Sequence, residues 1–120
     1  MLNPFTHHRS QRKILKKGRP GRARVVEKGA FPGSGHHPTY FRLRMTLHVQ
    51  VEGMAPYEVE DEWLVPGEDT AALTLGETQP IPVRVDPDDD QKVAIDWDGV
   101  REQYEQHKAA RRDELASSGS

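Results

Sequence analysis

Six aspartates lie within thirteen positions of the sequence, between residues 86 and 98, and carboxylates are among the ligands that calcium prefers. The first, third and fifth residues counted from Asp86 are aspartate, as in a calcium-binding loop. The sixth, however, is Gln91 where such a loop has glycine for its sharp turn, and the twelfth is Trp97 where it has a bidentate glutamate. The pattern therefore excludes an EF-hand.

The same residues have the chemistry of a tight turn. In Asp-Pro-Asp-Asp-Asp, residues 86 to 90, aspartate side chains accept hydrogen bonds from nearby backbone amides and the proline fixes φ. Asp96 or Asp98 would need a second acid beside it in a cleft to act in catalysis, and the spacing does not indicate one. Asp98 is instead placed to cap a following helix. We predict a structural turn here, with no catalytic residue, metal or cofactor.

Basic side chains are concentrated at the N-terminus. Residues 1 to 24 carry eight Lys or Arg and no acid, which is +8, whereas the other 96 residues carry nine basic and nineteen acidic groups, which is −10. Clustered Lys and Arg side chains bind anionic partners, above all through phosphate. The candidate partner-binding residues are Arg12, Lys13, Lys16, Lys17, Arg19 and Arg22.

Four uses of this basic arm remain open. In the first, the arm binds the phosphate backbone of nucleic acid, independently of the base sequence. It approaches an anionic lipid surface with Leu2, Phe5, Ile14 and Leu15 as shallow anchors. It docks on a protein partner, such as the acidic hairpin of a second copy or of its own chain, or it is only a solvated tail. Charge alone does not choose among these uses, and no small-molecule substrate is inferred.

Size and composition limit the class of protein further. A chain of 120 residues fits one domain. Because there is no cysteine, disulfides and thiolate chemistry are excluded, and a reducing compartment is allowed. No apolar run approaches the roughly 18 residues of a membrane-spanning helix, and the N-terminus lacks the apolar stretch of a signal peptide. We expect a cytoplasmic protein, with a membrane-peripheral location as the alternative.

The elements that must position these residues are predicted mainly by alternation of apolar and polar side chains. Residues 39 to 51, TYFRLRMTLHVQV, alternate without exception after the first position, which is typical of a half-buried strand. Residues 56 to 65 alternate again after a break at Gly53, so the two segments predict a β-hairpin. We expect Leu47 to face Val59 across this hairpin.

That register also arranges the outer face of the hairpin. It pairs Arg44 with Glu62 and His48 with Glu58, so that opposite charges meet across the strands. It places Asp61 on the core-facing side. This position is unfavourable for a carboxylate unless a bulge turns the side chain or the strand is open there.

Shorter patterns predict the remaining elements. They are a strand at 22–28, a short helical turn at 66–76, strands at 81–85 and 92–97, and a mostly solvated helix from residue 99. This order matches the OB-fold, whose helix lies between the third and fourth strands, while short strands and Gly/Pro turns suit an SH3-like barrel equally well. We predict a mainly β protein: a small five-stranded OB-like or SH3-like barrel with a short helical turn and a C-terminal α-helix.

The chain is accordingly divided into four segments. These are a basic disordered arm at 1–20, a β-barrel domain at 21–98, a C-terminal helix at 99–116 and a disordered tail at 117–120. Within the arm, QRKILKK is marginal as an isolated helix because it is only seven residues long. We expect a non-enzymatic binding or adaptor module whose arm contacts an anionic partner.

Loops supply a second set of candidates. In an OB-fold the loops between the first two and the last two strands contact ligands. The first loop contains His36 and His37, with Tyr40 beside it, and these three are candidate ligand residues. A zinc site is not indicated because it needs four ligands in fixed geometry. The second loop is the aspartate-rich turn, which repels phosphate. An enzyme that uses Asp61 with His48 or His36 is a less favoured alternative.

Several motifs resemble an uncharacterised bacterial family of small β-barrel domains, and they extend over residues 21 to 98. The family pattern is a Gly-x-Ala-x-Val start, then Leu-x-x-Gly, Pro-Val-x-Val-Asp-Pro-x-Asp and an Ala-x-Asp ending. The matching residues are Gly21, Ala23, Val25, Leu73, Gly76, Pro82, Val83, Val85, Asp86, Pro87, Asp88, Ala94 and Asp96. The resemblance implies a small β-barrel, joined in many relatives to membrane helices that this chain lacks, and it implies no catalytic residues.

Overall fold

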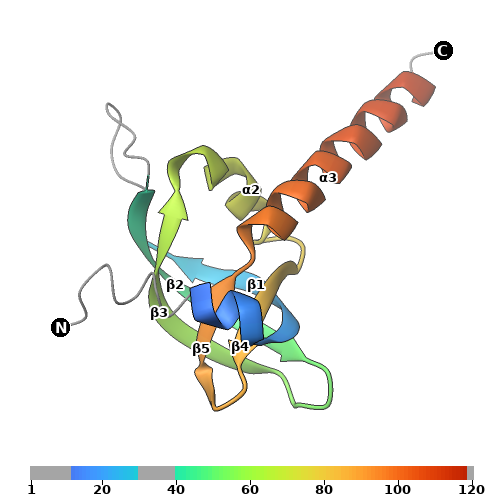
Figure 1. Ribbon diagram of the computed structural model, residues 1–120. Coiled ribbons are helices and arrows are strands. Elements are labelled where there is room, and N and C mark those ends of the chain that lie inside the picture. Colours follow the sequence, from blue (N-terminus) through green and yellow to red (C-terminus); the bar gives the residue numbers. More distant parts are fainter. Residues whose placement is uncertain (1–11, 30–39, 119–120) are drawn as a thin grey trace.

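The computed structural model describes residues 12–29 and 40–118, in which five antiparallel strands form a nearly closed barrel with a short helix and a C-terminal helix (Figure 1). The strands are β1 (Arg19–Lys28), β2 (Tyr40–Val51), β3 (Tyr57–Pro66), β4 (Ile81–Asp86) and β5 (Asp89–Ile95). The helices are η1 (Gly67–Asp69), α2 (Thr70–Leu75) and α3 (Trp97–Ser118). The prediction of a mainly β barrel with a short helical turn and a C-terminal helix is confirmed.

The pairing of β2 with β3 has the register that the alternation predicted. Leu47 lies opposite Val59 in the barrel interior. On the outer face, Arg44 lies opposite Glu62 and His48 opposite Glu58. The predicted register is therefore confirmed. The alternation specifies it because a shift of one residue would turn the whole apolar set of β2 toward solvent.

The core of the barrel is made by the inward-facing residues of all five strands together with α2 and α3. On β2 every second residue from Phe41 to Val51 is buried, and Trp63 of β3 is the largest fully buried side chain. Leu73 of α2 and Val100 of α3 are completely shielded from solvent. Burial of each such side chain contributes about 1.5–3 kcal/mol, so this interior is the main source of stability.

Two edge strands meet where the barrel closes. The sheet order is β3-β2-β1-β4-β5, so β3 and β5 are its edges. Two side chains of β3 join them: Trp63 Nε1 donates to the Val93 carbonyl and the Tyr57 hydroxyl donates to the Asp90 carbonyl, each at 2.8 Å. These bonds close the interior where no backbone ladder between β3 and β5 is present in the described residues.

The position of Asp61 follows from this edge. It lies opposite the buried Met45 in the β2–β3 register, as predicted, yet its side chain is exposed. No bulge interrupts the pairing of β2 with β3. Since β3 is an edge strand, the carboxylate reaches water, and its Oδ1 accepts a hydrogen bond from the Glu62 amide at 2.7 Å.

The C-terminal helix begins two residues earlier than predicted. Asp96 Oδ1, and not Asp98, accepts a hydrogen bond from the Gly99 amide at 3.2 Å, so Asp96 caps the helix and the prediction for Asp98 is wrong. Asp98 lies within the first turn and its carboxylate contacts Arg101 instead. Figure 1 shows α3 projecting from one end of the barrel, which it contacts only with its first turns.

The chain before the barrel also has structure. Residues 12–17 are helical, and β1 begins at Arg19, within the segment assigned above to a disordered arm. Ile14 is only 7% exposed. The backbone passes close to β4 at Gly18, where a Cβ atom would lie 3.0 Å from the Val85 carbonyl oxygen and 2.5 Å from the Ile14 carbonyl oxygen. Arg84 donates to the Gly18 carbonyl at 3.3 Å. This helix is therefore held beside β4.

Candidate anion-binding surface

A continuous basic segment runs from the first helix into β1. We call its seven basic residues the basic stripe: Arg12, Lys13, Lys16, Lys17, Arg19, Arg22 and Arg24. All seven are exposed, and no acidic residue interrupts them. Six are the partner-binding residues proposed from the sequence, and the seventh, Arg24, lies on the same strand as Arg22.

The charges of the basic stripe are not neutralised by the described part of the chain. Other basic side chains form ion pairs, for example Lys28 with Glu77 at 3.3 Å and Arg44 with Glu60 at 2.8 Å. None of the seven stripe residues forms an ion pair with another described residue. Arg22 makes a hydrogen bond at 3.1 Å, but its acceptor is the uncharged side chain of Gln103. The stripe is thus free to attract an external anion.

The arginines of β1 stand on a rigid support. β1 is the central strand, hydrogen-bonded to β2 on one side and β4 on the other. Arg22 and Arg24 point from its outer face, about 7 Å apart because side chains two residues apart share a face. Arg24 lies opposite His48, and Arg84 of β4 lies opposite the neighbouring Pro20. Arginines of the two neighbouring strands β1 and β4 therefore share this outer face.

The aspartate-rich segment is the turn that its chemistry predicted. Pro87 and Asp88 join β4 to β5. Asp86 Oδ1 accepts a hydrogen bond from the Asp88 amide at 2.8 Å, and Asp89 Oδ1 accepts one from the Gln91 amide at 3.1 Å. These side chains close the turn by mimicking backbone acceptors. No group of three or more His, Asp or Glu side chains in the described residues is arranged to hold a metal ion.

Two hollows at this acidic turn are lined by basic side chains as well as by aspartates. Lys13 and Lys17 line a groove of about 240 Å³ together with Asp86 and Asp88. Arg19 and the aspartates of the turn line a second hollow of about 360 Å³. The structure therefore divides the stripe: these three residues face acids, whereas the other four line neither hollow.

The outer face of β2 and β3 is different because its arginines form ion pairs with glutamates. Glu60 and Glu62 pair with arginines of β2, Arg44 at 2.8 Å and Arg42 at 3.7 Å. The sequence candidate Tyr40 is 52% exposed at the start of β2. The other two loop candidates, His36 and His37, are outside the described residues. This face has no excess of positive charge for a phosphate.

Asp61 and His48, one pair weighed for catalysis, are not brought together, and His36 lies outside the described residues. His48 points outward opposite Glu58, whereas Asp61 belongs to the core-facing set opposite Met45, so Asp61 and His48 lie on opposite faces of the sheet. Tyr57 has a clear perturbation: burial, and then the charges of Asp90 and Asp89, raise the pKa of its hydroxyl. That hydroxyl donates to the Asp90 carbonyl and thereby joins β3 to the acidic turn.

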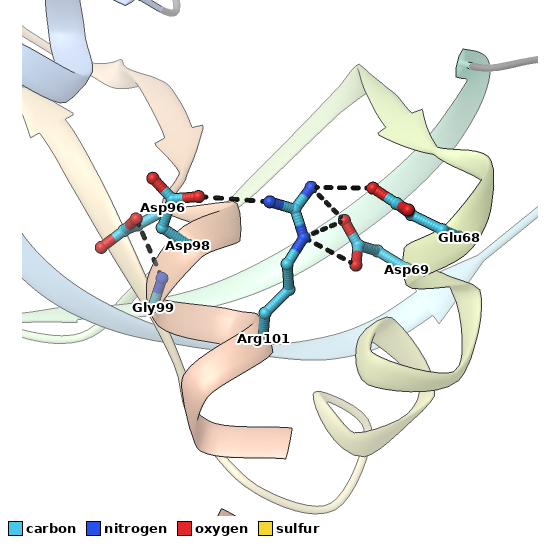
Figure 2. A network of polar contacts seen from close by, with 6 residues as sticks. All are labelled: Glu68, Asp69, Asp96, Asp98, Gly99 and Arg101. Atoms are coloured by element: carbon cyan, nitrogen blue, oxygen red, sulfur yellow. Dashed lines mark hydrogen bonds and ion pairs between the residues drawn. The ribbon is translucent and has the colours of Figure 1, made fainter. Parts of the chain in front are cut away.

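A polar cluster that the sequence did not predict surrounds Arg101. Figure 2 shows its guanidinium between Asp69 and Glu68 on one side and Asp98 on the other, with the shortest ion pair, 2.8 Å, to Asp69. The hydrogen bonds of Asp69 raise the pKa of Arg101, although burial of the guanidinium acts in the opposite direction. Arg101 therefore stays protonated and fastens α3 to the start of α2. The sequence contains no pattern that predicts this contact, because Asp69 and Arg101 are 32 residues apart.

Comparison with known proteins gives no family for this chain. No family model matches the sequence, and no curated protein or solved structure matches it. Over the described residues, no helix combines the length and apolar character needed to cross a membrane.

Proposed function

We propose that this protein is a non-enzymatic binding module that contacts the phosphates of nucleic acid through the basic stripe. The observation that carries the proposal is the set of seven exposed cations without an ion-pair partner among the described residues, on a chain whose remaining charges are mostly paired or acidic. Such a surface supports electrostatic, sequence-independent binding accompanied by release of counterions. A cytoplasmic location belongs to the same proposal, because a chain without cysteine suits a reducing compartment.

The proposal includes an OB-like arrangement of the barrel in preference to an SH3-like one. The strand order β3-β2-β1-β4-β5 supports it, as does a helix between β3 and β4. OB-folds are five-stranded, partly open Greek-key barrels, and many of them bind oligonucleotides. Here, however, the excess positive charge is on β1 and the preceding helix and not on β2 and β3.

The burial of Ile14 favours nucleic acid over a lipid surface. As a lipid anchor, the helix at residues 12–17 would insert its apolar side chains into the bilayer. Ile14 is instead packed on the barrel, and Gly18 and Arg84 hold the helix there. Insertion would require this contact to be broken, whereas phosphate binding uses the exposed lysines and arginines as they stand.

The test is fluorescence-anisotropy binding of labelled DNA to the full chain over about 50 to 200 mM salt. Arg12 and Arg24 are changed together to Gln, since neither lines the acidic hollows nor bonds a described residue. Substitution is used instead of truncation because removal of the arm would also remove Ile14. The matched control changes Arg111 and Arg112 to Gln at the far end of α3.

We expect wild-type binding to fall steeply with salt, and R12Q/R24Q to reduce the slope of log K against log salt by about 2. The Arg111/Arg112 control should keep the wild-type slope. Loss of affinity in both variants equally would point to net charge and against the stripe. No binding to DNA or RNA, with binding to phosphatidylserine vesicles, would replace this proposal by the lipid alternative.

A further inference from the structure

We infer that the nucleic acid bound by the basic stripe is double-stranded. This inference rests on the proposed function and adds the class of ligand. It is carried by two properties of the described surface: three of the cations, Arg19, Arg22 and Arg24, stand on a central strand, and no aromatic side chain among the described residues is exposed beside the stripe.

The aromatic side chains of the described residues provide no site for base stacking beside the stripe. Proteins that bind single strands combine a basic groove with rings on which successive bases stack. Phe41 and Trp63 are buried, and Trp97 and Tyr104 are partly buried and packed on the core. The hydroxyl of Tyr57 is engaged with Asp90. Each of these rings is therefore wholly or partly covered by the barrel.

Tyr40 is the one described aromatic residue with a largely exposed side chain, and it is far from the stripe. Arg24 lies opposite His48 on β2, and Tyr40 is eight residues further along that strand. At about 3.3 Å per residue this separation is about 26 Å. A base stacked on Tyr40 would therefore not share a short binding site with the arginines of β1.

The path that a single strand follows on an OB-fold is also unfavourable here. That path uses the face of strands 2 and 3, the loop between strands 1 and 2, and the loop between strands 4 and 5. The loop between strands 1 and 2 lies outside the described residues. On this barrel the arginines of that face are paired with Glu60 and Glu62, and the loop is the aspartate turn. A phosphate chain laid across it would meet glutamates and aspartates instead of free cations.

A duplex needs only the features that the stripe has. Its phosphates are held at fixed positions by base pairing, and they are recognised without contact to the bases. The backbone of Arg22 is paired with both β2 and β4 and that of Arg24 with β2, so the two backbone positions are fixed about 7 Å apart. The arginine side chains lose conformational freedom on binding, but the backbone that carries them does not. The same surface offers an unpaired base nothing beyond charge.

The experiment compares a labelled DNA duplex of about 20 base pairs with each of its separated strands, at one near-physiological salt concentration. The full chain is used as wild type, as Arg24→Gln and as the control Arg112→Gln. We expect the duplex to bind at least about tenfold more tightly than either strand. We also expect Arg24→Gln to weaken duplex binding severalfold and Arg112→Gln to leave it unchanged.

The outcomes separate this inference from the proposed function. Equal or tighter binding of a single strand, still weakened by Arg24→Gln, would overturn the inference and leave the proposed function standing. Absence of binding to both forms would overturn both. Duplex binding that Arg24→Gln and Arg112→Gln weaken equally would also overturn the inference, because the ligand would then not lie on β1.

Discussion

Asp69 is the one charged side chain that is buried among the described residues, with 4% of its surface exposed. A carboxylate taken out of water needs a partner that replaces the lost hydration. Arg101 is that partner, because its Nε donates to both carboxylate oxygens at 3.0 Å. The pair joins the first turns of α2 and α3, so it contributes to the docking of the C-terminal helix together with the buried side chain of Val100.

Loss of Arg101 should therefore destabilise the fold. We expect Arg101→Gln to lower the free energy of unfolding by about 2 kcal/mol, since a buried charge loses its hydrogen bonds. The value is below that for a fully buried pair because the guanidinium is 42% exposed. Chemical denaturation monitored by tryptophan fluorescence measures it, with Arg111→Gln on the same helix as the control.

A double-mutant cycle makes this prediction specific to the pair. Asp69→Asn should destabilise the wild-type protein but stabilise the Arg101→Gln variant, because it removes the charge that has lost its partner. If the two substitutions simply added, Arg101 would act through packing or through Glu68 and Asp98, and the role assigned to Asp69 would be wrong.

Single residues of the candidate site were predictable where charge alone identified them. The basic run predicts six residues of the stripe, whereas Arg24, which belongs to the same run, is not among the predicted partner-binding residues. The sequence alone did not indicate that the stripe residues lack ion-pair partners among the described residues. Lys28 and Arg24 look alike in the sequence, yet Lys28 has Glu77 beside it because the loop after α2 returns to β1.

Elements were predicted well where side chains repeat and less well at their ends. The alternation along β2 fixed its boundaries and its register with β3, because the period of two leaves only one way to bury Leu43, Leu47 and Val49. The start of α3 was misplaced because Asp96 and Asp98 are both acceptable caps, and only tertiary packing selects between them. The docking of the first helix was not predicted, because Ile14 is its one buried apolar side chain among the described residues and a single residue gives no periodic signal.

The start of α3 depends on a close approach between elements. A Cβ at Gly99 would lie 2.8 Å from Cγ of Pro82 on β4 and 2.8 Å from Oδ2 of Asp96, the capping residue. Alanine favours a helix over glycine by about 1 kcal/mol, so an uncrowded site would gain stability. Here the overlap should outweigh that gain.

We expect Gly99→Ala to lower the free energy of unfolding by about 1–3 kcal/mol, the usual range for an overpacked site. Thermal or urea unfolding of the full chain measures the change. Gly29→Ala is the matched control, because a Cβ there meets nothing closer than 3.6 Å and the protein should keep or slightly gain stability. A stabilised Gly99→Ala protein would show that α3 can move away from β4 without loss.

Over the whole molecule, the basic and acidic groups are separated but adjacent. The basic stripe runs from the first helix along β1, and the aspartate turn lies beside its N-terminal half. Lys13, Lys17 and Arg19 face this turn, whereas Arg24 is further along the strand. An approaching phosphate is therefore attracted by the stripe and repelled by the turn. We expect a phosphate to bind more strongly to stripe residues that lie farther from the aspartates.

Neutralising the turn should strengthen nucleic-acid binding without any new contact. Asp88 and Asp90 are exposed, and changing both to Asn keeps their size and their capacity to accept hydrogen bonds while it removes two negative charges. We expect duplex affinity to rise about three- to tenfold at low salt, and the gain to shrink toward about 200 mM as the repulsion is screened. Anisotropy titrations measure the gain against D113N/E114Q, which makes the same charge change at the far end of α3.

An equal gain in both variants would mean that net charge governs binding. A gain confined to the turn would mean that phosphates pass close to the N-terminal half of the stripe, where Lys13, Lys17 and Arg19 are held.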